Sequence, residues 1–457
     1  MIYQLKQIYR NKTQQVMFAT VLGMGATLFV DILIVVCLGT GFEADALIVG
    51  LSLPRLVDTI GREGTRLSLV SLLVDKQQQY THAVDYYVFV SGMLNLFLSV
   101  GIGIVILSWL FAQFLVKLMG PGLAIEAVDL ANFVFLWSIP LVVFALGSTV
   151  FSLVLNSHQD FIVASARNLI VSLVVIVAIG LSWRSERFVL WVAVAHTLGH
   201  LLYFVVIVLY SRNQIEFRWF WRAWPSKDTL IEFWGAIIYP TLGLGIRQGS
   251  RVAERAIASV VAPGGVAAYY FAFRLVSAIQ SIVGISIATT GLPKIAQLAL
   301  KECRQDFVDL LKRQAWHAIV FSFPIALGIF LWHNEIVALL YGRGSAQSDS
   351  VEQIGQILQY LSLSVVFWSL VPILTSAIYV YQRYGWVLVN IIGITVVNLL
   401  LAWWLSQFLG LSGIALSVTL SMFLSVLTLW KLVGYGMALQ AVPDYGAIQI
   451  PKKDSFS

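Results

Sequence analysis

Seven arginines lie inside apolar segments that are long enough to cross a lipid bilayer. They are Arg55, Arg62, Arg66, Arg247, Arg251, Arg255 and Arg274. Spacings of four and seven residues place two sets of them on single faces of α-helices. Because a charge at the bilayer centre costs at least about 2.5–3.5 kcal/mol, these faces must line a polar cavity or meet charged partners. Arg167 and Lys294 lie near predicted helix ends, where long side chains reach the membrane surface, and are set aside.

Acidic residues accompany these arginines in smaller number. They are Asp31, Asp58, Glu63 and Glu254. Full pairing would only hold helices together, but seven arginines against four acids leave three positive charges, which indicate a bound anion. Because arginine grips phosphate through a planar fork of N–H donors, the sequence predicts a phosphorylated ligand such as a pyrophosphate diester. Lipid-embedded helices favour a lipid-linked phosphate, although a soluble nucleotide stays open.

Three further polar residues could do chemistry, and each has a plainer interpretation. Asp31, in the middle of the first apolar segment, could couple transport to a proton or cation, but pairing with an arginine is favoured. His196 and His200 stand one turn apart in HTLGH, a spacing that can chelate a metal, yet no further ligand accompanies them and we expect a packing role. Phosphate-binding loops and paired catalytic carboxylates are not found in the sequence. We therefore expect no enzyme activity, no metal site and no cofactor.

The composition excludes a water-soluble fold. Hydrophobic residues make up 59% of the 457 residues and charged residues 11%, against about 45–50% and 25% in soluble domains. The mean hydropathy is +0.85. The sequence therefore predicts an all-α polytopic membrane protein. Its two cysteines, Cys37 and Cys303, are expected to be inert thiols, and no cleavable signal peptide is expected, because no small-residue cleavage site follows the first apolar segment.

Twelve apolar segments predict twelve transmembrane helices. They cover residues 16–40, 44–73, 86–112, 130–155, 161–183, 188–210, 231–262, 266–297, 314–334, 355–381, 386–408 and 411–434. The longest polar connection follows the sixth segment and divides the chain into two pseudo-symmetric six-helix bundles. We predict an N-terminal bundle over 1–210, an amphipathic linker over 211–230, a C-terminal bundle over 231–435 and a tail over 436–457.

Loop charges predict the orientation in the membrane. Lysines and arginines number 16 on the side of the termini and four on the other, where Lys117, Arg184, Arg187 and Arg343 lie. Because positive loops stay in the cytoplasm, both termini are predicted to be cytoplasmic. The linker interleaves tryptophans with arginines, which suits the membrane surface. The net charge of +6 is therefore a topology signal, and no nucleic-acid partner is expected.

A short internal repeat relates the two predicted bundles. PRLVDTIG begins at Pro54 and FRLVSAIQ begins at Phe273, so Arg55 and Arg274 take equivalent places in the second and eighth helices. Two halves of six helices have the same orientation in the membrane. Parallel repeats of this kind place the substrate site between the halves. We therefore expect the second, seventh and eighth helices to line a central polar cleft.

Three stretches of the chain resemble the MviN/MurJ-type flippases, a family in the multidrug, oligosaccharidyl-lipid and polysaccharide exporter superfamily. They begin at ADALIVGL, IRQGSRVA and IVALLYGR. The matching residues are Asp45, Ala46, Pro54, Leu56, Glu63, Gly64, Gln248, Ala258, Ser259, Gly265, Tyr270, Ala272, Arg274, Leu275, Gly284, Pro293, Tyr341 and Gly344. The resemblance implies a V-shaped pair of bundles that moves an undecaprenyl-pyrophosphate-linked sugar outward by alternating access.

The chain also departs from the members that carry the peptidoglycan precursor. Thr20 and Ala26 stand where those members have two first-helix arginines, Asp58 stands at their second-helix arginine, and their two additional C-terminal helices are not found here. Arg274 is the one arginine that carries over directly. A different lipid-linked glycan is therefore expected as the substrate.

The predicted function is a flippase for an undecaprenyl-pyrophosphate-linked oligosaccharide used in exopolysaccharide or another surface glycan. The predicted location is the bacterial cytoplasmic membrane, with membrane lipids as partners and polysaccharide synthesis proteins as a further candidate. Alternatives are a flippase of the peptidoglycan precursor lipid II, a cation-coupled multidrug exporter, and a scaffold that transports nothing. The seven arginines are the predicted substrate-binding residues, and the four acids are their charge partners or coupling groups.

Overall fold

The computed structural model describes residues 2–438 except 81, 184, 281–303, 345–347 and 382. Within this part of the chain, all regular secondary structure is α-helical. The helices are α1 Ile2–Leu38, α2 Phe42–Gln79, α3 Ala83–Leu110, α4 Ala112–Met119, α5 Ile125–Ser138, α6 Leu141–Ser157, α7 Ile162–Ser165, α8 Arg167–Ser182, α9 Phe188–Gln214, α10 Lys227–Val261, α12 Arg304–Leu331, α13 His333–Tyr341, α14 Ser348–Ser362, α15 Ser364–Val380, α16 Tyr384–Leu409 and α17 Leu411–Ala438. Residues 265–280 form a further helix.

Each of the twelve predicted spans corresponds to a helix or a broken helix. Eight spans are long and apolar enough to cross a membrane, and α14 with α15 adds a ninth that is bent by 42°. Of the other three, α8 is shorter, and α2 carries several arginines and acidic residues along its length. The eighth span is described only over residues 265–280. Residues 281–297 of that span, Arg184, Lys294, Cys303 and the tail beyond residue 438 lie outside the described residues. The predicted all-α fold of two pseudo-symmetric six-helix bundles is confirmed.

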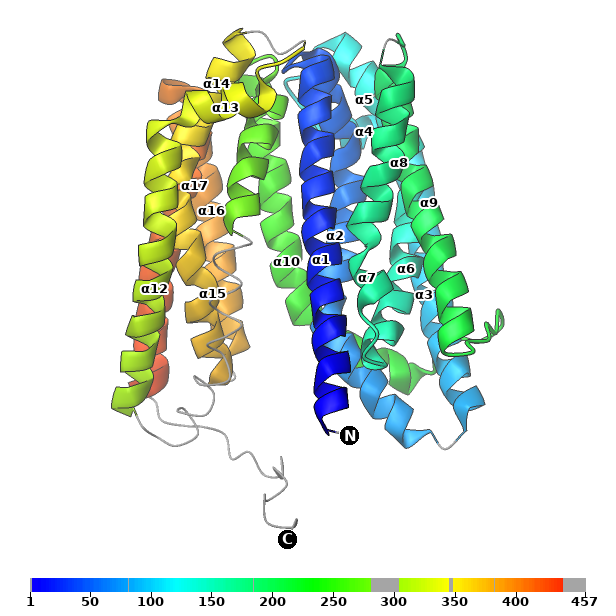
Figure 1. Ribbon diagram of the computed structural model, residues 1–457. Helices are drawn as coiled ribbons and strands as arrows, with labels where there is room; N and C mark the ends of the chain where they lie inside the picture. The colour runs from blue at the N-terminus through cyan, green and yellow to red at the C-terminus, as the bar shows by residue number, and fades with distance from the viewer. Residues whose placement is uncertain are drawn as a thin grey trace.

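Equivalent helix pairs pack together in the two halves. In the N-terminal half α1 packs on α8, α3 on α6, and α9 on both α5 and α6. In the C-terminal half α10 packs on α16, α12 on α15, and α17 on both α14 and α15. Figure 1 shows the C-terminal helices α12 to α17 on one side of α10 and helices α1 to α9 on the other. The start of α1 and the end of α17 lie at the same end of the molecule.

Two short helices repeat at the same place in each half, and the sequence analysis did not predict them. Helix α4 follows the third span and α13 follows the ninth, and each is followed by a broken span. At eight and nine residues these helices are too short to cross a membrane, so a search for long apolar segments does not find them.

The two halves are joined by hydrogen bonds at the end where α1 finishes, which the loop charges predict to be external. Asp45 of α2 accepts hydrogen bonds from the backbone N–H groups of Gly264 at 2.9 Å and Ala267 at 2.8 Å, and so caps the helix over 265–280. Thr40 donates to Ser350 at 2.8 Å. Gly264 has φ +74°, and a Cβ there would lie 1.9 Å from the Thr40 carbonyl oxygen, so glycine is required at this junction.

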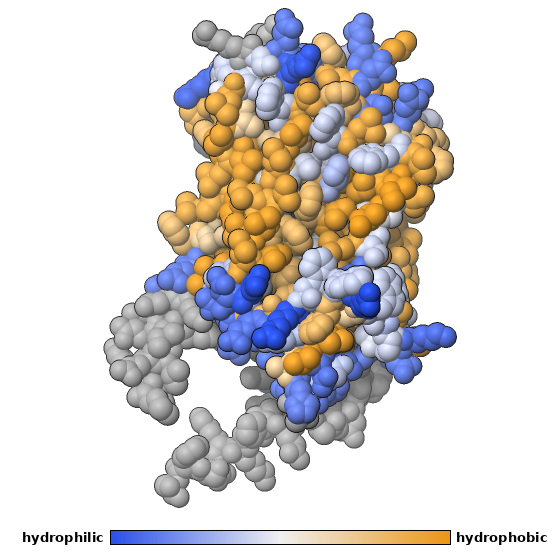
Figure 2. Space-filling view, turned by 90° about the vertical axis from the view of Figure 1, so that its right-hand side faces the viewer, coloured by the Kyte–Doolittle hydropathy of each residue, from blue (hydrophilic) through white to orange (hydrophobic). Residues whose placement is uncertain are grey.

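The surface and the linker are consistent with a membrane protein. Figure 2 shows an apolar band across one face, with hydrophilic residues above and below it. The segment between α9 and α10 docks on α3 through Asn95, whose Nδ2 donates to the carbonyl of Ala223 at 2.7 Å. Trp219 Nε1 donates to Asn95 Oδ1 at 2.9 Å. Trp221 stays 71% exposed, which leaves it free for the membrane surface.

Candidate substrate cavity between the two halves

A cavity of about 290 Å³ lies between α2, α10 and the helix over 265–280. Five of the seven predicted arginines line it, namely Arg55, Arg62, Arg251, Arg255 and Arg274. The expected cleft between the second, seventh and eighth helices is therefore present. Its arginines come from both halves, so one ligand could contact the two halves at once. Their binding role stays a prediction.

The other two arginines lie apart from this cavity. Arg247, one turn before Arg251 on α10, lines a neighbouring cavity of about 740 Å³. Arg66 is exposed on α2 and lines neither of the two cavities. The arginines of α10 therefore line both cavities, whereas on α2 the side chain of Arg66 lies outside them.

Arg55 is held by two neutral partners from different halves. Its Nη1 donates to the hydroxyl of Tyr270 at 2.8 Å, and its Nη2 lies 2.9 Å from Nε2 of His196. His196 Nδ1 lies 2.8 Å from the carbonyl oxygen of Val192, one turn earlier on α9. Since that carbonyl can only accept, Nδ1 carries a proton, and Nε2 of the neutral ring accepts from Arg55. His196 thus positions a cavity arginine, which goes beyond the packing role expected from the sequence.

Asp31 lies beside the cavity and pairs with one of its arginines. Arg274 Nε donates to Asp31 Oδ2 at 2.7 Å, and the Tyr270 hydroxyl donates to Asp31 Oδ1 at 3.3 Å. The Asp31 side chain is almost completely buried. The structure therefore places Asp31 as an arginine partner, which is the role that the sequence analysis favoured.

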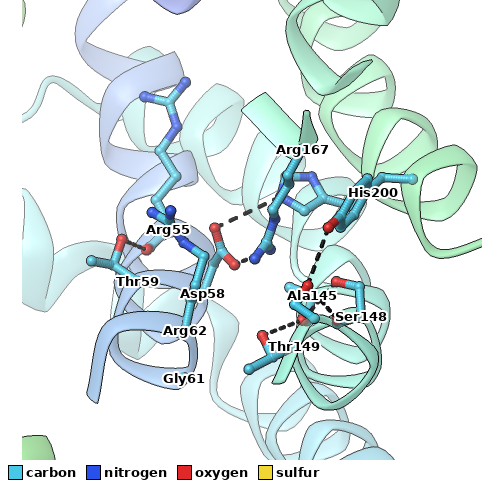
Figure 3. Close-up of polar contacts among 12 residues, drawn as sticks. Arg55, Asp58, Thr59, Gly61, Arg62, Ala145, Ser148, Thr149, Arg167 and His200 are labelled. Atoms are coloured by element: carbon cyan, nitrogen blue, oxygen red, sulfur yellow. Dashed lines mark hydrogen bonds and ion pairs between the residues drawn. The ribbon is translucent and has the colours of Figure 1, made fainter. Parts of the chain in front are cut away.

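Asp58 faces the interior of the N-terminal half instead of the cavity. It forms an ion pair with Arg167 of α8, and His200 Nε2 lies 3.8 Å from its second carboxylate oxygen. Figure 3 shows the Asp58 carboxylate turned toward both residues. Arg167 is only 4% exposed, so the expectation that it reaches the membrane surface is wrong. Its place near the start of the predicted span 161–183 suggested a surface position, but in the structure it begins α8, which packs against α1 and α9 with that residue buried.

The remaining two acids take different partners. Glu63 pairs with Arg62 at 3.2 Å, and both side chains are more than a third exposed. Glu254 is buried and accepts hydrogen bonds from Tyr269 at 2.6 Å, Asn398 at 2.6 Å and Ser250 at 3.1 Å. The expectation that Glu254 pairs with an arginine is not met within the described residues. Glu254 lies beside the arginine-bearing face of α10 and is directed toward Asn398 of α16.

Three cavity arginines have neutral partners. Within the described residues, no carboxylate lies within 4.0 Å of Arg55, Arg251 or Arg255. The guanidinium of Arg251 lies 4.9 Å from the ring centre of Phe273, and Arg255 Nε donates to the Arg251 carbonyl at 3.0 Å. Three of the seven predicted arginines therefore line one cavity without a carboxylate partner among the described residues. In the same part of the chain, no group of three His, Cys, Asp or Glu side chains is close enough to hold a metal ion.

Known proteins resemble this chain over most of its length. A family model described as "Lipid II flippase MurJ" matches residues 34–441. A protein of Thermotoga maritima is 23% identical over 86% of this chain and 78% of its own length. A protein of Buchnera aphidicola subsp. Schizaphis graminum is 24% identical over 91% of this chain and 82% of its own. Both are described as probable lipid II flippases.

Two solved structures share the fold. A lipid II flippase MurJ in an inward closed conformation superposes with a TM-score of 0.79 at 18% identity, covering 93% of this chain and 89% of its own. An inward-facing multidrug resistance MATE transporter superposes with a TM-score of 0.77 at 17% identity, covering 91% of this chain and 96% of its own.

These comparisons overturn one prediction. The predicted flippase for exopolysaccharide or another surface glycan is contradicted, because the family model and the curated relatives are described as flippases of lipid II. Of the departures that pointed elsewhere, Thr20 and Ala26 lie outside the matched residues 34–441, whereas Asp58 lies within them. The match covers most of the 457 residues, and the chain belongs to the MurJ family.

Proposed function

We propose that this protein is a flippase that moves lipid II, the polyprenyl-diphosphate-linked peptidoglycan precursor, across the bacterial cytoplasmic membrane. The observation that carries the proposal is the set of three cavity arginines, Arg55, Arg251 and Arg255, that have neutral partners. A diphosphate supplies the negative charge that this cavity lacks. The descriptions of the relatives supply the identity of the glycan.

Arginine suits this task for a physical reason. Its guanidinium stays charged when it leaves water, and its parallel N–H donors match two oxygens of a phosphate. Tyr270 accepts a hydrogen bond from Arg55, and Asp31 accepts one from Arg274, so both guanidinium groups are already oriented. This pre-arrangement reduces the conformational entropy that a ligand must remove when it binds. The phosphates of one substrate would thus contact α2 of one half and α10 of the other.

Transport by alternating access requires the external end to open. In the structure that end is closed by the contacts of Asp45 with Gly264 and Ala267, and by a hydrogen bond from the Gly122 N–H to Ser259 at 3.0 Å. Two of these contacts are hydrogen bonds to the Asp45 carboxylate and the third is a hydrogen bond to a hydroxyl. Opening would therefore exchange hydrogen bonds within the protein for hydrogen bonds to water. We propose that phosphate binding between the halves favours their rearrangement, with no covalent chemistry involved.

Reconstitution tests the proposal. The purified protein in liposomes should transfer labelled lipid II between leaflets, and Arg251→Ala with Arg255→Ala should lower the rate to that of empty liposomes. Arg212→Ala is the matched control, because Arg212 is exposed at the end of α9, away from the cavity lining. A double variant that transfers lipid II at the wild-type rate would contradict the proposal, as would wild-type protein that transfers none.

A further inference from the structure

The two halves of the molecule differ in one groove that lies away from the cavity between them. In the C-terminal half α12 and α17 both pack on α15, and a groove of about 280 Å³ is lined by these three helices. The equivalent helices of the N-terminal half are α3, α9 and α6, and there too the first two pack on the third. The pseudo-symmetry of the halves therefore allows a direct comparison.

In the N-terminal half the linker after α9 fills the corresponding place. Phe217 of the linker is buried, and its ring centre lies 5.9 Å from that of Tyr87 on α3 and 5.4 Å from that of Phe151 on α6. Phe151 is the eleventh residue of α6, and Leu374, which lines the C-terminal groove, is the eleventh residue of α15. The chain thus covers the first of two equivalent grooves with its own aromatic side chain.

The C-terminal groove stays open among the residues that the structure describes. Ile373 and Leu374 of α15 are buried and form its apolar floor. Trp316 of α12 and Trp430 of α17 line its sides and are 64% and 41% exposed. Lys312, one turn before Trp316, adds a positive charge to the lining. An apolar floor with a cation and two indoles at its rim matches a molecule that is apolar at one end and anionic at the other.

The level of the groove in the membrane agrees with such a molecule. Figure 1 shows the start of α12 and the end of α17 at the end of the molecule where α1 begins, which the loop charges predict to be cytoplasmic. Lys312 lies eight residues after the start of α12, and Trp430 lies eight residues before the end of α17, so each is about 12 Å along its helix from that end. Indole rings gather at the headgroup level of a membrane, and lysine side chains extend toward it.

The charges around the groove favour an anionic occupant. Within the described residues, Lys312 forms no ion pair. Arg313 and Lys431, which neighbour lining residues in the sequence, are exposed. Asp306 and Asp309 lie nearer to the start of α12 and are not among the lining residues. Because the cytoplasmic leaflet contains anionic lipids, lysines and arginines near its surface attract them.

We propose that this groove binds an anionic phospholipid of the cytoplasmic leaflet, such as phosphatidylglycerol. Its phosphate lies at Lys312, and the indole N–H groups of Trp316 and Trp430 can donate to its phosphate or ester oxygens. One acyl chain lies on the floor of Ile373 and Leu374. The lipid covers α15 between two helices as the linker covers α6. The site is separate from the arginine cavity and does not depend on the proposed function.

Photolabelling of the purified protein tests the site. The probes are phosphatidylglycerol and zwitterionic phosphatidylcholine, each with a photoreactive group in one acyl chain, and labelled peptides are identified by mass spectrometry. We expect phosphatidylglycerol to label the stretches 312–319, 370–374 and 426–430. Lys312→Ala should lower this labelling about fivefold, as expected for one charge near the membrane surface, and leave labelling by phosphatidylcholine within about twofold. Lys117→Ala is the matched control, because Lys117 is an exposed lysine on α4 in the other half.

Four results would overturn the inference. The label could be missing from the three stretches, which would show that the groove binds no phospholipid. Equal labelling by both probes, without an effect of Lys312→Ala, would show unselective contact with lipid. Loss of the phosphatidylglycerol label in excess lipid II would assign the groove to the lipid-linked substrate. Stronger labelling after deletion of residues 439–457 would assign it to the C-terminal segment of the chain itself.

Discussion

Arginine occurs in two environments in this protein, and the partners of the guanidinium differ between them. In the N-terminal half Arg167 is buried against Asp58, and the carboxylate also faces His200 (Figure 3). In the cavity between the halves, Arg251 lies over the ring of Phe273 and Arg255 donates to the backbone carbonyl of Arg251. A neutralised arginine holds helices together, whereas an arginine with neutral partners keeps its charge available. The comparison indicates that the partners of an arginine, more than its depth in the membrane, distinguish arginines that hold helices together from those proposed to bind the substrate.

The largest effect is expected at the paired arginine. Arg167→Ala leaves the buried Asp58 without its cation, and breaking a buried pair costs about 3–5 kcal/mol. The variant should lose folded protein, measured by yield in detergent and by melting temperature. Arg255→Ala, which removes no ion pair, should melt close to wild type. Equal melting temperatures for the two variants would remove the distinction between the two environments.

The next effect is expected at Arg274, which combines both environments because it pairs with Asp31 and lines the cavity. Arg274→Ala should abolish lipid II transport and also lower stability, since Asp31 is left buried and unpaired. Adding Asp31→Asn should restore the melting temperature but not transport. Arg274→Lys should retain part of the activity, because an ammonium keeps the charge without the planar fork. Recovery of transport in the double variant would show that Arg274 serves only to neutralise Asp31.

A smaller effect is expected for Asp31→Asn alone. An amide oxygen can still accept from Arg274, so transport should fall by several-fold without being lost. The rate is to be measured in liposomes with and without an imposed proton or cation gradient. Complete loss, together with loss of any dependence on the gradient, would instead assign Asp31 the coupling role.

Much of the fold could be predicted from the sequence, because membrane spans are recorded in long apolar segments. Within the described residues, each of the twelve predicted segments contains a helix or a broken helix, the eighth only over residues 265–280. Spacings of four and seven residues identified the arginine-bearing faces of α2 and α10. The short helices α4 and α13 were missed, since eight or nine residues carry no spanning signal.

The ion-pair and hydrogen-bond partners of the charged side chains were harder to predict from the sequence than the helix faces that carry them. Helical spacing predicts that Asp58 lies close to the face of Arg55, whereas in the structure its carboxylate turns to Arg167, which is 109 residues away in the sequence. Likewise, HTLGH suggested a metal site or a packing role, and only the structure places His196 against Arg55. The one available signal was the rarity of intramembrane charge, which should have kept Arg167 among the candidates.

The most direct test of the account is the binding of undecaprenyl diphosphate to purified protein. Arg251→Gln with Arg255→Gln keeps side-chain volume and hydrogen bonding but removes two charges, and each charged hydrogen bond is worth about 1.5–3 kcal/mol. We therefore predict at least about a hundredfold loss of affinity, with an unchanged melting temperature. Arg62→Gln removes an arginine already paired with Glu63 and should change the affinity less than about threefold. Equal losses for the two variants, or none for either, would contradict the claim that the arginines with neutral partners bind the phosphates.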